Sequence, residues 1–160
     1  MNSSQNILTT SNKIIAIDFD GTIVEHKYPE IGPEMLFAFA TIRELQKRGH
    51  TLILWTYRHG EYVDAAVNYC LENGLEFYAV NENYPGETKE EMGSRKIYAD
   101  VYIDDRNLGG FPGWTNVWQQ LHPEGGDFLH QLTDELAHYN YKPEKKNWFA
   151  ALMNKLGLGS

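Results

Sequence analysis

The sequence predicts an α/β fold in which a parallel sheet carries helices on both faces, in the three-layer arrangement of Rossmann-like domains. Short apolar runs alternate along the chain with longer segments whose apolar residues have helical spacing. Acidic or hydroxyl residues directly follow several of these runs, which is typical of parallel strands that end at a ligand crevice. At 160 residues the chain is long enough for one domain with a single hydrophobic core.

The first half of the chain supplies two predicted strands and two predicted helices. The apolar run 14–17 predicts a buried strand, and Pro33 stands where the first position of a crossover helix is expected. The β-prone run 51–55 predicts a second buried strand. A second helix is expected over about 61–73, with Gly74 as its stop.

The second half continues the alternation. Residues 75–80 predict a third strand, followed by an irregular polar loop over 81–86. Residues 100–103 predict a fourth strand, and the Gly-rich and Pro-containing stretch 109–113 predicts turns. A last helix of this domain is expected over about 127–139.

Both ends of the chain are set apart from the predicted domain, which spans residues 13–140. Residues 1–12 are polar and predict a disordered lead, and residues 141–160 form a tail. Within the tail, residues 145–156 have the spacing of an amphipathic helix with lysines on its polar surface. Because this segment is short and carries few cations, docking on its own domain or on a partner subunit is favoured over a membrane surface.

Composition excludes several classes of protein. With 14 basic and 22 acidic residues the net charge is −8, which disfavours a nucleic-acid partner because polyanions are repelled. No run is apolar enough to span a bilayer, and residues 1–12 lack a signal-peptide pattern, so we expect a cytoplasmic protein with no membrane partner. The one cysteine, Cys70, falls on the apolar face of the second predicted helix and is expected to be buried and reduced. That face also carries Val63, Ala66, Val67 and Leu71.

An acidic motif directly follows the first strand. Asp18 and Asp20 are separated by one residue, so their side chains are expected on the same side of the strand end. Two carboxylates together with a substrate phosphate form a typical Mg²⁺ site. Gly21 then lets the chain turn through dihedral angles that other residues avoid. The alternative is an ordinary acidic turn, in which Asp and Gly are common.

Further chemical groups stand at the ends of other predicted strands. Thr56 ends the second strand, and Asp104 with Asp105 ends the fourth. If strand four lies beside strand one, the crevice opens beside strand one and the acidic groups meet there. Arg58 lies two residues after Thr56, in the loop expected beside the crevice, and is a candidate substrate-binding residue. The alternatives are that Thr56 only caps a helix and that Asp105 only forms a surface pair with the next residue.

These motifs resemble, in order, those of the haloacid dehalogenase (HAD) superfamily. The letters DFDGT match its first motif, LILWT its second, and VYIDD its fourth. Lys96 is the best candidate for the third motif, and Lys89 and Arg95 compete with it. The resemblance covers about residues 13–110, and the stretch from Tyr78 to the second acidic pair looks like a small capless (C0-type) branch of bacterial hydrolases. It implies a HAD-type fold without a cap domain.

The resemblance also implies roles for these residues. Asp18 is the implied nucleophile, and Asp20 the general acid and base. Mg²⁺ is the implied cofactor, held by Asp18, the backbone carbonyl of Asp20 and Asp104, with Asp105 as alternative ligand or outer neighbour. Thr56 and Lys96 are expected to bind the phosphoryl group.

The sequence therefore predicts a magnesium-dependent phosphatase that hydrolyses a phosphate monoester through an aspartyl-phosphate intermediate. The substrate is a phosphorylated small molecule or a larger phosphoester, because an uncovered site admits bulky groups. A neighbouring subunit can also cover such a site, so a homo-oligomer is a further possibility. Two alternatives remain: a non-catalytic phosphate-binding or receiver-like signalling module, and a polynucleotide end phosphatase.

Overall fold

A four-stranded parallel sheet forms the centre of the structure, a computed structural model that describes residues 11–140, with side chains to residue 134. The strand order is β3-β2-β1-β4, and every neighbouring pair is parallel. Strand β1 lies between β2 and β4, so the order reverses beside it, as predicted. The strands span Ile14–Ile17 (β1), Thr51–Leu54 (β2), Ala79–Val80 (β3) and Val101–Ile103 (β4).

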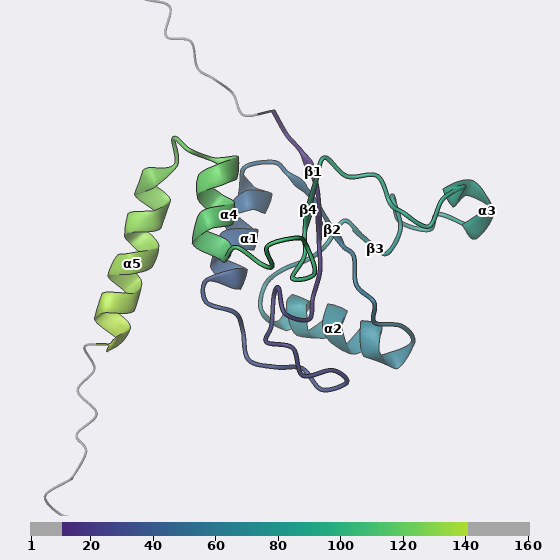
Figure 1. Ribbon diagram of the computed structural model, residues 1–160, viewed down its shortest axis with the longest axis horizontal. Coiled ribbons are helices and arrows are strands. Elements are labelled where there is room, and N and C mark those ends of the chain that lie inside the picture. Colours follow the sequence, from purple (N-terminus) through teal and green to yellow (C-terminus); the bar gives the residue numbers. More distant parts are fainter. Residues whose placement is uncertain (1–10, 141–160) are drawn as a thin grey trace, which may run out of the picture. The chain divides into compact units, whose positions relative to one another are not determined.

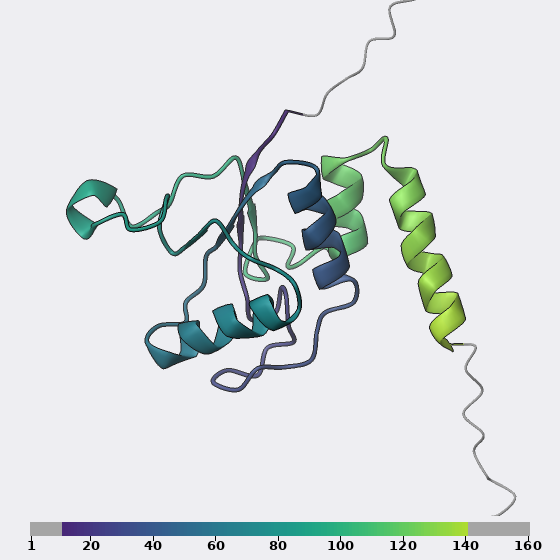
Figure 2. The same ribbon diagram turned by 180° about the vertical axis from the view of Figure 1, so that it is seen from behind.

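Helices flank the sheet, which confirms the predicted Rossmann-like α/β class. The first unit of the structure ends at Gly125 and contains α1 (Ala38–Lys47), α2 (Glu61–Glu72), α3 (Lys89–Met92) and α4 (Trp114–Leu121). Helices α1 and α4 lie together on one side of the strands, and the segment that carries α3 lies on the other (Figures 1 and 2). A second unit begins at Gly126 with α5 (Gly126–Asn140), the helix predicted over about 127–139.

The sheet is buried on both faces. On one face, Ala16, Ile53 and Ala79 pack with Ile97 from the segment that leads into β4. The neighbouring strand residues Ile15 and Ile17 have no exposed surface either. This burial explains why the strands consist of continuous apolar runs instead of alternating polar and apolar residues.

The first helix begins later than predicted. Pro33 is not helical, because its carbonyl oxygen accepts a hydrogen bond from the backbone N–H of Glu25 (2.8 Å) in a short extended pairing. Residue Phe37 then adopts a left-handed backbone conformation (φ 66°) just before α1 starts at Ala38. The Glu34 carboxylate accepts the N–H of Phe39 (3.0 Å) and so supplies a cap that Phe37 cannot. The predicted start at Pro33 was wrong because tertiary pairing overrides a common helix signal.

The third strand is shorter than predicted. Leu75 donates its N–H to Cys70 (2.9 Å) and so still belongs to the turn that ends α2, which leaves only Ala79–Val80 in the ladder. Two helices were not predicted. The α3 segment has a capping box between Thr88 and Glu91, and the α4 segment follows the turns around Gly113. Apolar residues at 114, 117, 118 and 121 did carry the helical signal for α4.

The remaining predictions concern α2, membrane-spanning helices and the two ends of the chain. Helix α2 lies where it was predicted, and Cys70 is buried on it at 1% exposure, whereas Leu71, expected on the same apolar face, is 47% exposed. Within residues 11–140 no helix combines the length and the apolar character that crossing a bilayer requires. The predicted disordered lead largely, and the predicted amphipathic helix over 145–156 entirely, lie outside the described residues.

Candidate functional site

A cavity of about 510 Å³ opens at the carboxyl ends of β1, β2 and β4. Its lining includes Asp18 and Asp20 after β1, Thr56 and Arg58 after β2, and Asp104 after β4. The remaining lining residues are His26, Tyr28, Trp55, Tyr57 and Arg106. The strand ends therefore bring together most of the side chains that the sequence marked as candidates.

Three carboxylates converge at the β1–β4 edge of this cavity. Ligand oxygens of Asp18, Asp104 and Asp105 all lie within 4.8 Å of one another. The backbone supports this arrangement: the N–H of Asp18 donates to the carbonyl of Ile103 (2.9 Å), and the N–H of Arg106 donates to the carboxylate of Asp104 (2.8 Å). The predicted meeting of the two acidic motifs is confirmed. Both members of the second acidic pair take part, although the sequence favoured Asp104.

Gly21 makes this convergence possible. Its φ of 85° lies in the left-handed region, and a Cβ built there would overlap the Asp105 carboxylate. The turn also receives support from a distant helix, because the indole N–H of Trp114 donates to the carbonyl of Thr22 (2.9 Å). The Thr22 hydroxyl in turn donates to Asp18 (3.4 Å). A side chain at position 21 would therefore separate the two acidic motifs.

The carboxylate cluster is electrostatically strained. Burial, together with the repulsion of Asp104, Asp105 and Asp20, raises the pKa of Asp18 to about 7, although a hydrogen bond from the Phe19 backbone acts in the opposite direction. Burial also raises the pKa of Asp105, and Asp104 adds to that rise. Arg106, whose Nε lies 4.0 Å from Asp105, and His26 act in the opposite direction on the pKa of Asp105, but they do not cancel the rise.

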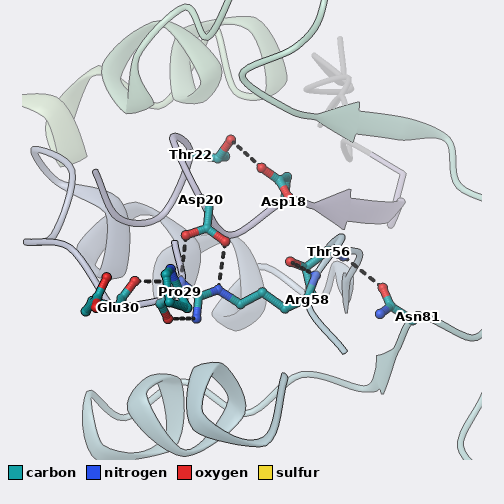
Figure 3. Close-up of polar contacts among 8 residues, drawn as sticks. All are labelled: Asp18, Asp20, Thr22, Pro29, Glu30, Thr56, Arg58 and Asn81. Carbon is teal, nitrogen blue, oxygen red and sulfur yellow. Dashed lines mark hydrogen bonds and ion pairs between the residues drawn. The ribbon is translucent and has the colours of Figure 1, made fainter. Parts of the chain in front are cut away.

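Asp20 has a different partner. The Arg58 Nε and Nη2 each donate to one carboxylate oxygen of Asp20, and both distances are 2.7 Å (Figure 3). The arginine side chain is 1% exposed and that of Asp20 is 11% exposed, so this two-pronged ion pair is nearly removed from water. Arg58 was predicted to bind substrate, but its guanidinium is committed to Asp20 in this structure.

Arg58 also fixes the loop that follows β1. Its Nη1 donates to the carbonyl of Pro29 (3.0 Å), and Nη2 donates to the carbonyl of Glu30 (2.8 Å) (Figure 3). The guanidinium lies over the rings of Phe19 (4.9 Å) and Tyr28 (5.3 Å). All five N–H groups of an arginine lie in one plane, so a single side chain can satisfy this many acceptors at once.

Thr56 is held by the end of the third strand. Its backbone N–H donates to the side-chain oxygen of Asn81 (2.8 Å), and its hydroxyl accepts the N–H of Arg58 (3.2 Å) (Figure 3). Asn81 adopts a left-handed backbone conformation (φ 56°), which asparagine tolerates better than most residues. The sequence did not mark Asn81 as a site residue; an asparagine directly after a buried strand was the available signal.

The predicted third-motif lysine does not line the cavity. Lys96 is exposed, and its ammonium group lies 4.9 Å from the centre of the Tyr102 ring. That ring packs against Trp55, which does line the cavity. The competing residues Lys89 and Arg95 are exposed as well and are absent from the cavity lining. The catalytic role of Lys96 stays a prediction.

The donor set at the β1–β4 edge fits a hard divalent cation. Oxygen ligands are what Mg²⁺ prefers, and a cation would relieve the mutual repulsion that raises the pKa of Asp18. The Asp20 carboxylate is not part of the three-carboxylate group, and the sequence assigned only its backbone carbonyl to the metal. The geometry thus separates the acidic residues into a cluster suited to a cation and one carboxylate bound by arginine.

Comparison with solved structures finds matching chains. The chain is similar to a solved structure described as that of the conserved protein coded by a locus from Bacteroides thetaiotaomicron. The two sequences are 48% identical, the match covers 71% of this chain and 93% of that chain, and the TM-score is 0.67. No family model matches the chain, and neither does any curated protein.

Proposed function

We propose that this chain, which belongs to the same family as the conserved Bacteroides thetaiotaomicron protein, is a magnesium-dependent phosphatase acting on phosphate monoesters. The observation that carries the proposal is the convergence of Asp18 with Asp104 and Asp105 beside a cavity that also contains Asp20. A nucleophilic carboxylate, a cation site and a second carboxylate near the leaving group are the parts that such a hydrolysis needs.

Two carboxylates divide the chemistry. An oxygen of Asp18 attacks phosphorus, forming an aspartyl phosphate while the bond to the ester oxygen breaks and Asp20 gives that oxygen a proton. Water then attacks the phosphorus of the intermediate, Asp20 takes up a proton from the water, and the bond to Asp18 breaks to release inorganic phosphate. Arg58 donates one hydrogen bond to each oxygen of Asp20, so the proton is carried on one of the lone pairs that remain free.

The cation would be held by Asp18, Asp104 and Asp105, with the backbone carbonyl of Asp20 as the further ligand that the sequence predicts. When bound, Mg²⁺ neutralises charge on the phosphoryl group and on the carboxylates around it. We expect Thr56 to bind a phosphate oxygen, because its hydroxyl accepts a hydrogen bond from the Arg58 backbone and its own proton is free to be donated.

The same proposal includes a HAD-type fold without a cap domain. In support, the stretch between Asp20 and Thr56 contains one loop, α1 and β2, and the stretch from Thr56 to Lys96 contains α2, β3 and α3. Neither stretch holds a further sheet. A cavity open to solvent is consistent with a substrate larger than phosphate itself.

The alternatives receive less support. A receiver-like module would need an aspartate at the end of β3, where this chain has Asn81, and that amide is used to hold Thr56. A polynucleotide end phosphatase is disfavoured by the net charge of −8. Binding to single-stranded DNA that survives high salt would restore this alternative.

A panel of phosphate esters, assayed with and without Mg²⁺, tests the proposed function. We expect hydrolysis that requires the metal and that Asp18→Asn lowers by at least about 10³-fold, since a nucleophile cannot be replaced by a neutral amide. Asp64→Asn, an exposed carboxylate on α2, is the control and should leave the rate unchanged. An Asp18→Asn protein as active as the parent would overturn the proposal. Lys96→Met, compared with Lys89→Met, asks in the same assay which lysine serves the phosphoryl group.

A further inference from the structure

The cavity has an aromatic wall as well as an acidic one. Its lining includes four side chains with rings, namely His26, Tyr28, Trp55 and Tyr57, and we call these four residues the ring wall. They come from the loop after β1 and from the segment directly after β2. The ring wall therefore surrounds the same space into which Asp18 and Asp20 project their carboxylates.

Two members of the ring wall are held in place by other rings. Trp55 packs edge to face against Tyr102, with ring centres 5.2 Å apart. Tyr28 packs against Tyr62 at 5.5 Å and also lies against the Arg58 guanidinium. Because these rings are already ordered, the protein loses little additional side-chain entropy when a ligand stacks on them.

Tyr57 contrasts with both. Its side chain is 93% exposed, and within the described part of the chain it makes no ring contact and no side-chain hydrogen bond. A single exposed tyrosine is ordinary on a protein surface. This one, however, lines the cavity and stands between Thr56 and Arg58, so its ring is available to a group attached to a bound phosphate.

Few polar groups remain for the part of a substrate beyond its phosphate. Asp20 and Arg58 satisfy each other, and the acidic cluster is suited to a cation. The ring wall has polar atoms only at its edges, namely the Tyr28 and Tyr57 hydroxyls, the Trp55 indole N–H and the ring nitrogens of His26, and Arg106 adds an exposed guanidinium 4.0 Å from Asp105. A polyhydroxylated leaving group would use these edges alone, whereas a flat ring would also find several ring faces.

We propose that the leaving group of the phosphate ester is a flat unsaturated ring system that binds against the ring wall, with Tyr57 closing over it. This inference rests on the proposed phosphatase function and names its substrate class. The cavity volume of about 510 Å³ fits an aryl or heterocyclic group together with the phosphate.

Binding and turnover are tested separately. Binding is measured by calorimetry in Mg²⁺ buffer, comparing benzylphosphonate with butylphosphonate, neither of which can be hydrolysed at its P–C bond. Turnover is measured with phenyl phosphate and hexafluoroisopropyl phosphate, whose leaving alcohols have similar acidity, so that a difference reports the ring and not the chemistry. The variants are Tyr57→Ala, the ring-retaining Tyr57→Phe, and Tyr78→Ala. Tyr78, which is 51% exposed, lines a separate groove beside His50 and serves as the control tyrosine.

We expect benzylphosphonate to bind more tightly than butylphosphonate, and Tyr57→Ala to lower the aryl-to-alkyl ratio of kcat/KM by about tenfold. Tyr57→Phe should restore most of the ratio, and Tyr78→Ala should leave both substrates unaffected. Equal binding of the two phosphonates, or a Tyr57→Ala ratio equal to that of the parent, would overturn the inference while hydrolysis of either ester still supports the phosphatase. A preference for benzylphosphonate that depends on Tyr57, in a protein that hydrolyses neither ester, would support the ring site and overturn the proposed function.

Discussion

Titratable side chains cluster at both ends of the sheet, but the two clusters differ in their hydrogen-bond and charge partners. At the carboxyl end, Asp18 lies among carboxylates of which only Asp105 has a nearby cationic partner, the exposed Arg106 at 4.0 Å. At the amino end, His50 and His122 are 5% and 2% exposed, and their Nε2 atoms lie 2.9 Å apart. Carboxylates meet at one end and imidazoles at the other, but only the imidazoles have a hydrogen-bond partner for every polar ring atom.

The hydrogen bonds of the histidine pair run in one direction. The N–H of Lys13 donates to Nδ1 of His50 (3.0 Å), so the proton of a neutral His50 sits on Nε2 and is donated to His122. The remaining N–H of His122 then donates to Glu124 (3.2 Å), and the Trp118 ring stacks on the imidazole at 4.6 Å. Every ring nitrogen has a partner. The histidine network is thus complete within the chain, whereas the three-carboxylate group is one that could hold a metal ion.

The largest effect on stability is expected from Arg58→Met, which removes the buried ion pair between Arg58 and Asp20. Removing the guanidinium leaves Asp20 buried without a partner, so the free energy of unfolding should fall by about 3–5 kcal/mol in urea titrations. Lys47→Met, which breaks only an exposed ion pair with Glu44, should change it by less than about 1 kcal/mol. Adding Asp20→Asn to Arg58→Met should recover a large part of the loss. If the double variant is no more stable than Arg58→Met, the unpaired charge is not the cause.

Asp18→Asn should have a smaller and opposite effect. In the metal-free protein at pH 8 it removes a partly desolvated and repelled charge, and the raised pKa corresponds to about 4 kcal/mol, of which solvent screening at this half-buried carboxylate leaves a rise of about 2 kcal/mol in the free energy of unfolding. The pKa of Asp18 is raised from 3.8 to about 7 in the folded state, so its contribution is complete below pH 4 and is lost as the pH rises through 7. Thermal unfolding measured from pH 4 to pH 8 should show this decline in the parent and not in Asp18→Asn. Added Mg²⁺ should abolish the decline as well; a decline that persists in the variant would assign it to other groups.

The smallest effect is expected at the amino end. Burial, with His122 and Lys13 adding to it, lowers the pKa of His50, so its contribution to stability is present above pH 6.5 and is lost as the pH falls through the folded value. His50→Asn keeps an acceptor for the Lys13 N–H but cannot be protonated. Made in the Asp18→Asn background, it should remove the loss of unfolding free energy that accompanies acidification. His130→Asn, at an exposed histidine, serves as the control. An acid loss of the same size in both variants would show that the histidine pair does not titrate.

Much of this arrangement could be predicted from the sequence, because it depends on strand ends. The alternation of apolar runs and helical segments predicted a parallel sheet, and Asp18 meets Asp104 and Asp105 because β4 does lie beside β1, the arrangement on which that expectation was conditional. The bidentate Arg58–Asp20 pair could not be predicted, since it depends on which rotamers meet across two loops. The histidine pair was missed for the same reason, as His50 and His122 are 72 positions apart and follow no ligand spacing. The late start of α1 reflects pairing between residues 23–25 and 33–35, which local propensity does not encode.

The hydrogen bonds of Arg58 join the loop after β1 to the carboxylate of Asp20 through one side chain. The loop at Pro29 and Glu30 cannot lift from the body of the protein without disturbing the guanidinium, and the guanidinium cannot move without loosening Asp20. The ring of Tyr28, which belongs to the ring wall, rests on the same guanidinium. If Asp20 is the proton donor, as proposed, a ring that binds beside Tyr28 would contact the same arginine that holds the acid, so substrate binding and proton transfer would share one side chain.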